Sequence, residues 1–193
     1  MTTSRRPGRT ATILAISTLT IGAVAAAATV AFSTSGNAPT AARAGDVITL
    51  SSAKSGLCAD IAQHALLPGT TVIRKACDTS SPFQKWQVGV RGTSITLKNS
   101  GNGLCLVVPN TMPNTVLSVT TCARRSGQSF AEVRQGSRFQ LLNDHSKLCV
   151  SDAAQGVASG GAISQQECTP ARPQLWTLVI RTASSAPSPT LPS

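Results

Sequence analysis

Ile48-Thr49-Leu50, followed by Leu57-Cys58, begins a pattern that occurs three times in the chain. The later copies are Ile95-Thr96-Leu97 with Leu104-Cys105, and Phe139-Gln140-Leu141 with Leu148-Cys149. Ten residues separate the first residue of the triplet from the cysteine in every copy. The constant spacing indicates three copies of one structural unit in a shared register.

Each copy continues with a second cysteine and a Gln-x-aromatic triplet. The second cysteines, which follow the first after 19, 17 and 19 residues, are Cys77, Cys122 and Cys168. The triplets are Gln84-Lys85-Trp86, Gln128-Ser129-Phe130 and Gln174-Leu175-Trp176. The chain therefore contains a threefold repeat with a period of 44 to 47 residues, and such a repeat decides which folds can be considered.

The repeat divides the 193 residues into three parts. Residues 1–44 are predicted to be a signal peptide or membrane anchor with a small-residue linker. Residues 45–181 are predicted to form one domain, with repeats at about 46–91, 92–135 and 136–181. Residues 182–193 are rich in proline and serine and are predicted to be a disordered tail.

The first part has Arg5, Arg6 and Arg9 before an uncharged stretch at residues 10–32. A basic flank, an apolar run and small residues at 25–28 favour a cleaved signal peptide, with the mature chain starting after residue 31 or so. The same apolar run is also long enough to remain as an anchor with its arginines on the inner side. Both interpretations deliver the domain outside the cytoplasm.

All six cysteines lie inside the repeats, which fits disulfide formation in an oxidising compartment. The pairing that threefold symmetry preserves within each unit joins Cys58 to Cys77, Cys105 to Cys122, and Cys149 to Cys168. A metal site is not expected, because the sequence has no C-x-x-C motif and its two histidines, His64 and His145, occupy unrelated repeat positions. No cofactor is expected either.

Short apolar or alternating runs, separated by Gly, Asn, Ser and Pro, predict strands and little helix within residues 45–182. Each unit has four candidate strands: 47–51, 57–60, 71–77 and 86–90; 94–98, 104–108, 116–122 and 130–134; 138–142, 148–151, 162–168 and 176–180. A propeller blade also has four strands, but propellers typically need about four to eight blades. Three units therefore predict an all-β fold, the β-trefoil, in which a small barrel is closed by a hairpin cap.

The repeated apolar residues are predicted to form the core of this trefoil. The leucines Leu57, Leu104 and Leu148 are expected at the pseudo-threefold axis, together with Ile48, Ile95 and Phe139. The aromatic residues of the Gln-x-aromatic triplets, Trp86, Phe130 and Trp176, are expected to fill matching positions between the units. About 140 residues provide enough interior for such a core.

The domain is basic, with thirteen Lys and Arg against seven Asp and Glu over residues 45–182. This excess favours attraction to anionic surfaces or polymers. Nucleic acid is not an expected partner, because the cations occur singly or in pairs, as in Arg74-Lys75 and Arg124-Arg125, and few aromatic residues are available to stack on bases.

Leu-Cys-x-Asp, a second cysteine and Gln-x-Trp, in a threefold repeat over about residues 46–181, resemble the ricin B-type lectin family. Small trefoil domains of that family are common as carbohydrate-binding modules in secreted bacterial proteins. The resemblance implies a sugar site in each unit, with an acid two residues after the first cysteine. An aromatic residue two before the second cysteine stacks on the sugar ring, and an Asn just before Gln-x-Trp adds a hydrogen bond.

This sequence keeps few of the sugar-binding residues that the resemblance implies. In the first unit Asp60 holds the acid position, but Lys75 and Phe83 replace the aromatic residue and the Asn. The second unit has Val107, Thr120 and Gly127 at these positions, and the third has Ser151, Gln166 and Pro173, with Asp152 one residue late. The resemblance thus leaves one candidate carbohydrate site, around Asp60, Lys75 and Gln84, and two degenerate ones.

Asp60 has two interpretations. It is either a sugar ligand, with Phe83 or Trp86 as the stacking partner, or a structural acid that pairs with Lys75 or a turn amide, and the missing aromatic residue favours the second. The repeated glutamines are expected to bond to the backbone rather than to a ligand. Cations near this site, namely Arg74, Lys75 and Lys85, would suit an anionic sugar or glycopolymer.

No catalytic arrangement is visible, so the protein is not expected to be an enzyme. Asp144-His145 lacks a nucleophile motif, and nothing places two carboxylates at a common site.

The expected function is a non-catalytic, lectin-like carbohydrate-binding module, either secreted or on the extracytoplasmic face of the membrane. The alternative is an extracellular protein-interaction or protease-inhibitor trefoil that presents loops such as 63–70 and 110–114. The expected partner is accordingly a carbohydrate or glycopolymer, anionic ones included, or an extracellular protein. A membrane is a partner only if the N-terminal segment is retained.

Overall fold

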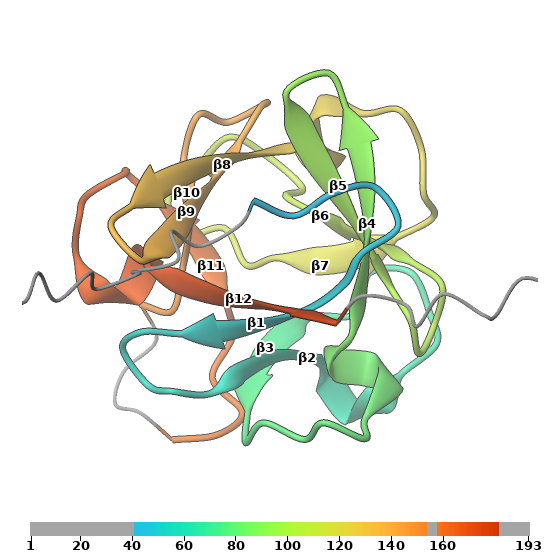
Figure 1. Cartoon of the computed structure of the whole chain (residues 1–193). Helices are drawn as coiled ribbons and strands as arrows, with labels where there is room; N and C mark the ends of the chain where they lie inside the picture. The colour runs from blue at the N-terminus through green and yellow to red at the C-terminus, as the bar shows by residue number, and fades with distance from the viewer. Residues whose placement is uncertain (1–40, 154–157, 182–193) are drawn as a thin grey trace, which may run out of the picture. The chain divides into compact units, whose positions relative to one another are not determined.

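A closed ring of six strands forms the body of the protein in a computed structural model that describes residues 41–153 and 158–181 (Figure 1). Going round the ring, each strand pairs antiparallel with the next, and the last returns to the first. The strands are β1 (Val47–Ser52), β4 (Trp86–Arg91), β5 (Ser94–Asn99), β8 (Phe130–Gln135), β9 (Arg138–Asn143) and β12 (Trp176–Arg181).

Three short hairpins, one from each unit, complete the fold. They are β2 (Cys58–Ile61) with β3 (Val72–Lys75), β6 (Cys105–Val107) with β7 (Ser118–Thr120), and β10 (Cys149–Ser151) with β11 (Ser164–Gln166). All twelve strands predicted from the sequence are present, and the β-trefoil is confirmed. The third strand of each unit is shorter than predicted at both ends, and its predicted first residue, Thr71, Val116 or Ala162, forms an isolated bridge to a neighbouring hairpin.

The three disulfides each lie within one unit, as threefold symmetry predicts. They join Cys58 to Cys77, Cys105 to Cys122, and Cys149 to Cys168. In each pair the first cysteine is buried and begins the first strand of the hairpin, while the second lies just beyond the other strand. Each bridge therefore ties together the open end of one hairpin.

The repeated glutamines hold the chain on both sides of the second cysteine. Each ends a short 3-10 turn: η2 (Pro82–Gln84), η3 (Ser126–Gln128) or η4 (Arg172–Gln174). The side-chain oxygen accepts a hydrogen bond of 2.7–2.8 Å from the backbone N–H just after that cysteine, at Asp78, Ala123 or Thr169. The side-chain amide donates to the carbonyl just before it, at Ala76, Thr121 or Glu167. The backbone role predicted for these glutamines is confirmed.

The core differs from the prediction at one set of residues. Trp86, Phe130 and Trp176 are buried, and so are Ile48, Ile95 and Phe139. The leucines expected at the axis, Leu57, Leu104 and Leu148, are instead half-buried, because they precede the hairpin strands and lie in the turns that follow the barrel strands. The small central cavity of about 10 Å³ is lined by residues two positions later, namely Ala59, Leu106 and Val150.

Glu132 interrupts the apolar pattern of the barrel strands. The equivalent residues of β4 and β12 are Val88 and Leu178. The Oε2 atom of Glu132 accepts a hydrogen bond of 3.2 Å from the backbone N–H of Ala42, while the buried Oε1 has no hydrogen-bond partner among the described residues. Burial raises the pKa of Glu132, and the Ala42 N–H opposes this shift.

The Glu132→Gln variant is expected to raise the free energy of unfolding near pH 7 by about 1 kcal/mol, because glutamine keeps an acceptor for Ala42 without burying a charge. Since the pKa is raised in the folded protein, the wild type gains stability as the pH falls through that pKa towards the ordinary glutamate value. The difference between the two proteins should therefore shrink. Urea denaturation between pH 4 and 8 measures it, and a difference that widens in acid would contradict the assignment.

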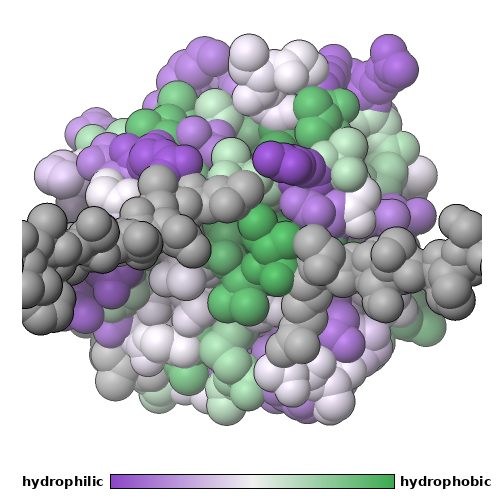
Figure 2. Space-filling model, in the orientation of Figure 1, coloured by the Kyte–Doolittle hydropathy of each residue, from purple (hydrophilic) through white to green (hydrophobic). Residues whose placement is uncertain are grey.

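The surface of the domain is polar around an apolar centre in the view of Figure 2, near β12. No helix among residues 41–153 and 158–181 is long and apolar enough to cross a membrane. Residues 1–40 of the segment 1–44 that is predicted to be a signal or anchor with its linker lie outside the described residues, as does the predicted tail at 182–193.

Candidate functional site

The three residues predicted to bind sugar lie in contact in the first unit. Asp60 is on β2, Lys75 ends β3, and Gln84 ends η2. The Gln84 amide donates to Asp60 Oδ2 at 2.9 Å, and the backbone N–H of Ile61 donates to Asp60 Oδ1 at 2.6 Å. Lys75 Nζ lies 3.9 Å from Asp60 Oδ2. The sequence therefore identified a real cluster around one carboxylate.

Only part of this cluster reaches solvent. Asp60 is completely buried and Gln84 is nearly so, whereas the side chain of Lys75 is 45 % exposed. The Gln84 amide also donates to Ala76 O, so its donors are used inside the protein. Asp60 and Gln84 thus support the site from below, and Lys75 is the member of the predicted set that can touch a ligand.

His64 belongs to the same cluster, although the sequence pattern does not predict it there. It ends η1 (Ala62–His64), and its Nε2 lies 3.5 Å from Asp60 Oδ1 and 3.2 Å from Lys75 Nζ. Because an ammonium can only donate, Nε2 is the acceptor in the contact with Lys75. His64 has no counterpart in the other units, so the repeat does not predict its role. Its position four residues after Asp60 is the sequence feature that could have indicated a contact between the two side chains.

An aromatic stack covers the other side of the histidine. The rings of His64 and Phe83 are parallel, with centroids 4.4 Å apart. Phe83 also lies against Gly101, where an added Cβ would come within 2.5 Å of the phenyl ring. Trp86, the other stacking partner considered for a sugar, lies fully buried in the core and is unavailable to one.

The turn that carries His64 is strained. Gln63 and His64 have φ values of 54° and 52°, in the left-handed region that costs a non-glycine residue about 1–2 kcal/mol. This turn places the imidazole in contact with Asp60, Lys75 and Phe83. These contacts hold the turn in its strained conformation and offset the cost.

Arg74 does not belong to the first-unit site, so its assignment to the cations there was wrong. Successive residues of a strand face opposite ways, and Arg74 points away from Lys75. It is buried, forms an ion pair with Asp152 and donates from Nε to Ala158 O at 2.8 Å. Asp152 also accepts hydrogen bonds of 2.7 Å from the hydroxyl groups of Ser52 and Ser55. These contacts join the first and third units internally.

The second and third units lack the carboxylate. Val107, Thr120 and Gly127 line one surface hollow of about 370 Å³, so the three positions implied by the family resemblance do converge. In the third unit Ser151 is buried and Gln166 donates to Asn114 Oδ1 at 2.6 Å. Among the described residues, no group of three His, Cys, Asp or Glu side chains could hold a metal ion.

Comparison with known proteins agrees with this architecture. The family described as the ricin-type beta-trefoil lectin domain matches residues 46–176. The designed 3-fold symmetric protein ThreeFoil is 20% identical with a TM-score of 0.66, over 69% of this chain and 97% of that one. No curated protein matches the chain.

Two natural proteins of known structure are also similar. An exo-beta-1,3-galactanase from Clostridium thermocellum is 20% identical with a TM-score of 0.66, over 70% of this chain but 30% of that one. The Macrolepiota procera ricin B-like lectin, solved in complex with lactose, is 16% identical with a TM-score of 0.63, over 72% of this chain and 98% of that one. At these identities the structural likeness shows the fold alone.

Proposed function

Since the chain belongs to the ricin-type beta-trefoil lectin family, we propose that it is a non-catalytic carbohydrate-binding module whose remaining sugar site lies in the first unit. The observation that carries the proposal is the partly exposed Lys75, whose ammonium lies 3.9 Å from the buried Asp60 carboxylate at the family's acid position. The lactose complex of the Macrolepiota procera lectin supports a sugar as the ligand.

Lys75 and His64 supply the groups that meet this sugar. Both side chains are partly exposed above the buried Asp60, and an ammonium donates well to hydroxyl or carboxylate oxygens. In this protein Phe83 stacks on His64 and not on a sugar ring. We therefore expect weak binding, with a Kd on the order of 1 mM.

The module acts outside the cytoplasm, either secreted or on the extracytoplasmic face of the membrane. Its three disulfides support this location, because such bonds persist in oxidising compartments. The basic, apolar and small-residue pattern at the N-terminus supports a cleaved signal peptide.

The Lys75→Gln variant tests the site, and Gln166→Ala is its matched control. Gln166 occupies the equivalent position of the third unit, where no carboxylate is present. On a glycan array followed by titration with the best neutral ligand, Lys75→Gln should weaken binding about five- to tenfold, the scale of one charge-assisted hydrogen bond. Gln166→Ala should change it less than twofold. An empty array, or equal affinities for both variants, would refute the first-unit site.

A second candidate function is a protein-interaction or protease-inhibitor trefoil. The loops at 63–70 and 110–114 expose large apolar side chains: Leu66 is 64% and Leu67 71% exposed in the first, and Met112 is 67% exposed in the second. If this candidate is right, the protein should inhibit a member of a protease panel, and Leu66→Ser with Leu67→Ser should abolish the inhibition. If the double variant still inhibits the protease, the loop at 63–70 is not the inhibitory surface.

A further inference from the structure

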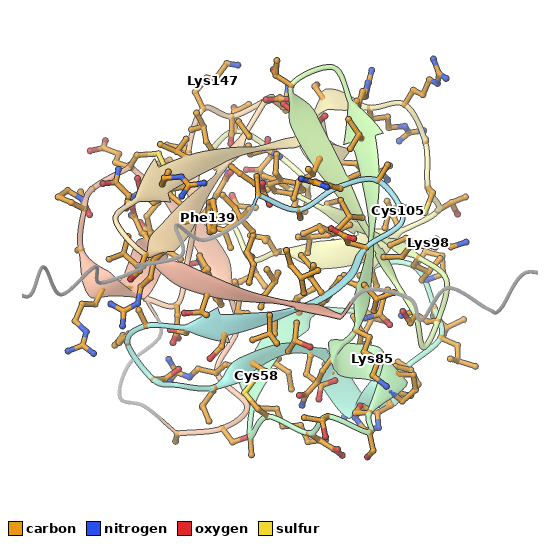
Figure 3. All side chains as sticks on the ribbon, viewed as in Figure 1. Cys58, Lys85, Lys98, Cys105, Phe139 and Lys147 are labelled. Carbon is orange, nitrogen blue, oxygen red and sulfur yellow. A yellow bond between two sulfur atoms is a disulfide. The ribbon has the colours of Figure 1, made fainter. Side chains whose placement is uncertain are left out.

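A separate hollow of about 560 Å³ lies beside the Cys105–Cys122 disulfide. It shares no lining residue with the 370 Å³ hollow at the sugar-site position of the same unit. Arg91 from the end of β4, Thr96 from β5 and Arg124 after the second cysteine line it, and its lining includes no acidic side chain among the described residues. Its volume falls within the roughly 300–1,000 Å³ of small-ligand sites. Figure 3 shows Cys105 on the β4–β5 side, apart from Cys58.

Small side chains create this hollow in the second unit. Thr96 on β5 pairs with Gly89 on β4, and a Cβ added to Gly89 would lie 2.5 Å from Thr96 Oγ1. The equivalent pair in the first unit is Thr49 with Val179, and the hollow there measures only about 180 Å³. The Val179 side chain lines the smaller hollow, whereas Gly89 is not among the residues that line the larger one.

The third unit fills the same place with a glutamine. Gln140 corresponds to Thr96, pairs with Val133, and is only 5% exposed. Its side-chain amide donates to Thr169 O at 2.5 Å and lies 3.3 Å from Gln174 Oε1. A longer side chain at this position is therefore compatible with the fold and occupies the hollow.

Two arginines make the hollow of the second unit basic. Arg91 donates from Nη2 to Arg124 O at 3.2 Å, which holds its guanidinium beside the segment that carries Arg124. The residues equivalent to Arg124 are Thr79 and Pro170. In the first unit Asp78 lines the hollow, and hydrogen bonds from Ser80 lower the pKa of Asp78, so that space carries a negative charge.

We propose that this hollow binds the carboxylate or sulfate group of an acidic polysaccharide through Arg91 and Arg124. Guanidinium groups match the geometry of such oxyanions, and the 53% exposed Val90 offers an apolar contact for the sugar ring. Arg125, the next residue, lines the neighbouring hollow, so positive charge continues along the surface. This continuation favours a charged polymer over a single small anion. The site is independent of Asp60 and Lys75, and goes beyond the function proposed above.

Two variants remove the site in different ways, and each takes its residue from another unit. Arg124→Thr installs the residue of the first unit and removes the charge. Thr96→Gln installs the residue of the third unit, where the glutamine bonds to the carbonyl after the second cysteine, and fills the hollow without changing any charge. Arg172→Gln is the matched control, because Arg172 is an exposed arginine of the third unit that donates to Ala53 O.

Titrations with polygalacturonate fragments, dextran sulfate and neutral dextran test the proposal on the whole protein. The wild type should bind at least one of the acidic polymers but not dextran, and the polymer that binds distinguishes carboxylate from sulfate. Arg124→Thr and Thr96→Gln should each lower this affinity about tenfold, and Arg172→Gln less than twofold. Near-UV circular dichroism confirms that each variant is folded.

Three results would overturn the proposal. The first is that the wild type binds neither acidic polymer, and the second is that Thr96→Gln binds with unchanged affinity. The third is that Arg172→Gln loses as much affinity as Arg124→Thr, which would indicate attraction by net charge alone. The first-unit sugar site is tested by a different measurement, the affinity of the Lys75→Gln variant for neutral glycans. Either proposal can therefore be refuted while the other is supported.

Discussion

Replacing Asp152 with asparagine is expected to lower the free energy of unfolding by about 3–5 kcal/mol, because the guanidinium of Arg74 would remain buried without its counter-charge. Both residues are almost completely inaccessible to water. Asp152 also accepts from Ser52 and Ser55, so the change weakens further contacts between the first and third units. Urea denaturation at neutral pH measures the loss.

This ion pair occupies a junction that the other units close differently. Asn99 and Asn143 end β5 and β9, and each donates its side-chain amide to a carbonyl of the preceding unit, at 2.8 Å to Phe83 O and 3.0 Å to Gly127 O. At the equivalent end of β1 stands Ser52, whose hydroxyl donates to Asp152 instead. The third-to-first junction therefore depends on the buried charges where the others use an amide.

A double variant provides the control for this prediction. Asp152→Val installs the residue of the second unit, Val108, and Arg74→Met keeps a long side chain without charge. With both changes no charge is buried, so the double variant should be at least about 2 kcal/mol more stable than Asp152→Asn. If the double variant is the less stable of the two, the cost of Asp152→Asn does not come from the unpaired guanidinium.

Changing both Cys105 and Cys122 to serine is expected to cost about 3 kcal/mol in the free energy of unfolding, because the cross-link limits the entropy of the unfolded chain. The two cysteines are 17 residues apart and tie the open end of the β6–β7 hairpin. Urea denaturation under oxidising conditions measures the difference. A variant as stable as the wild type there would show that the Gln128 contacts hold this hairpin without the bridge.

The fold could be predicted from the sequence because its determinants repeat. The constant distance from Ile48, Ile95 and Phe139 to the first cysteine sets the same turn three times, and the Gln-x-aromatic triplets place a glutamine and a core aromatic in register. The position of Leu57 was harder to predict, because its depth depends on where the turn ends and the strand begins. A pattern of apolar residues does not resolve that boundary.

The candidate sites could be predicted less well, because they depend on residues that do not repeat. Asp60, Lys75 and Gln84 were found through the family resemblance. The repeat does not predict His64, which occurs in one unit alone, and its placement requires two residues with left-handed backbone, which no sequence pattern indicates. Arg74 and Asp152 lie in the hairpins of different units, 78 positions apart, so their pairing follows only from the way these hairpins meet in the fold.

The pairing of β1 with β12 along their whole length places Val47 directly opposite Arg181. A short linker between these residues would make the polypeptide continuous across the junction, and new termini could then be opened at the turn around Gly92, between β4 and β5. Such a circular permutant would retain every strand pair. Its first strand would be β5 and its last strand β4, so the pair that joins the two ends of the chain would be β4 with β5 instead of β1 with β12. We expect the trefoil to tolerate this rearrangement, because each unit contributes its strands to the ring in the same way.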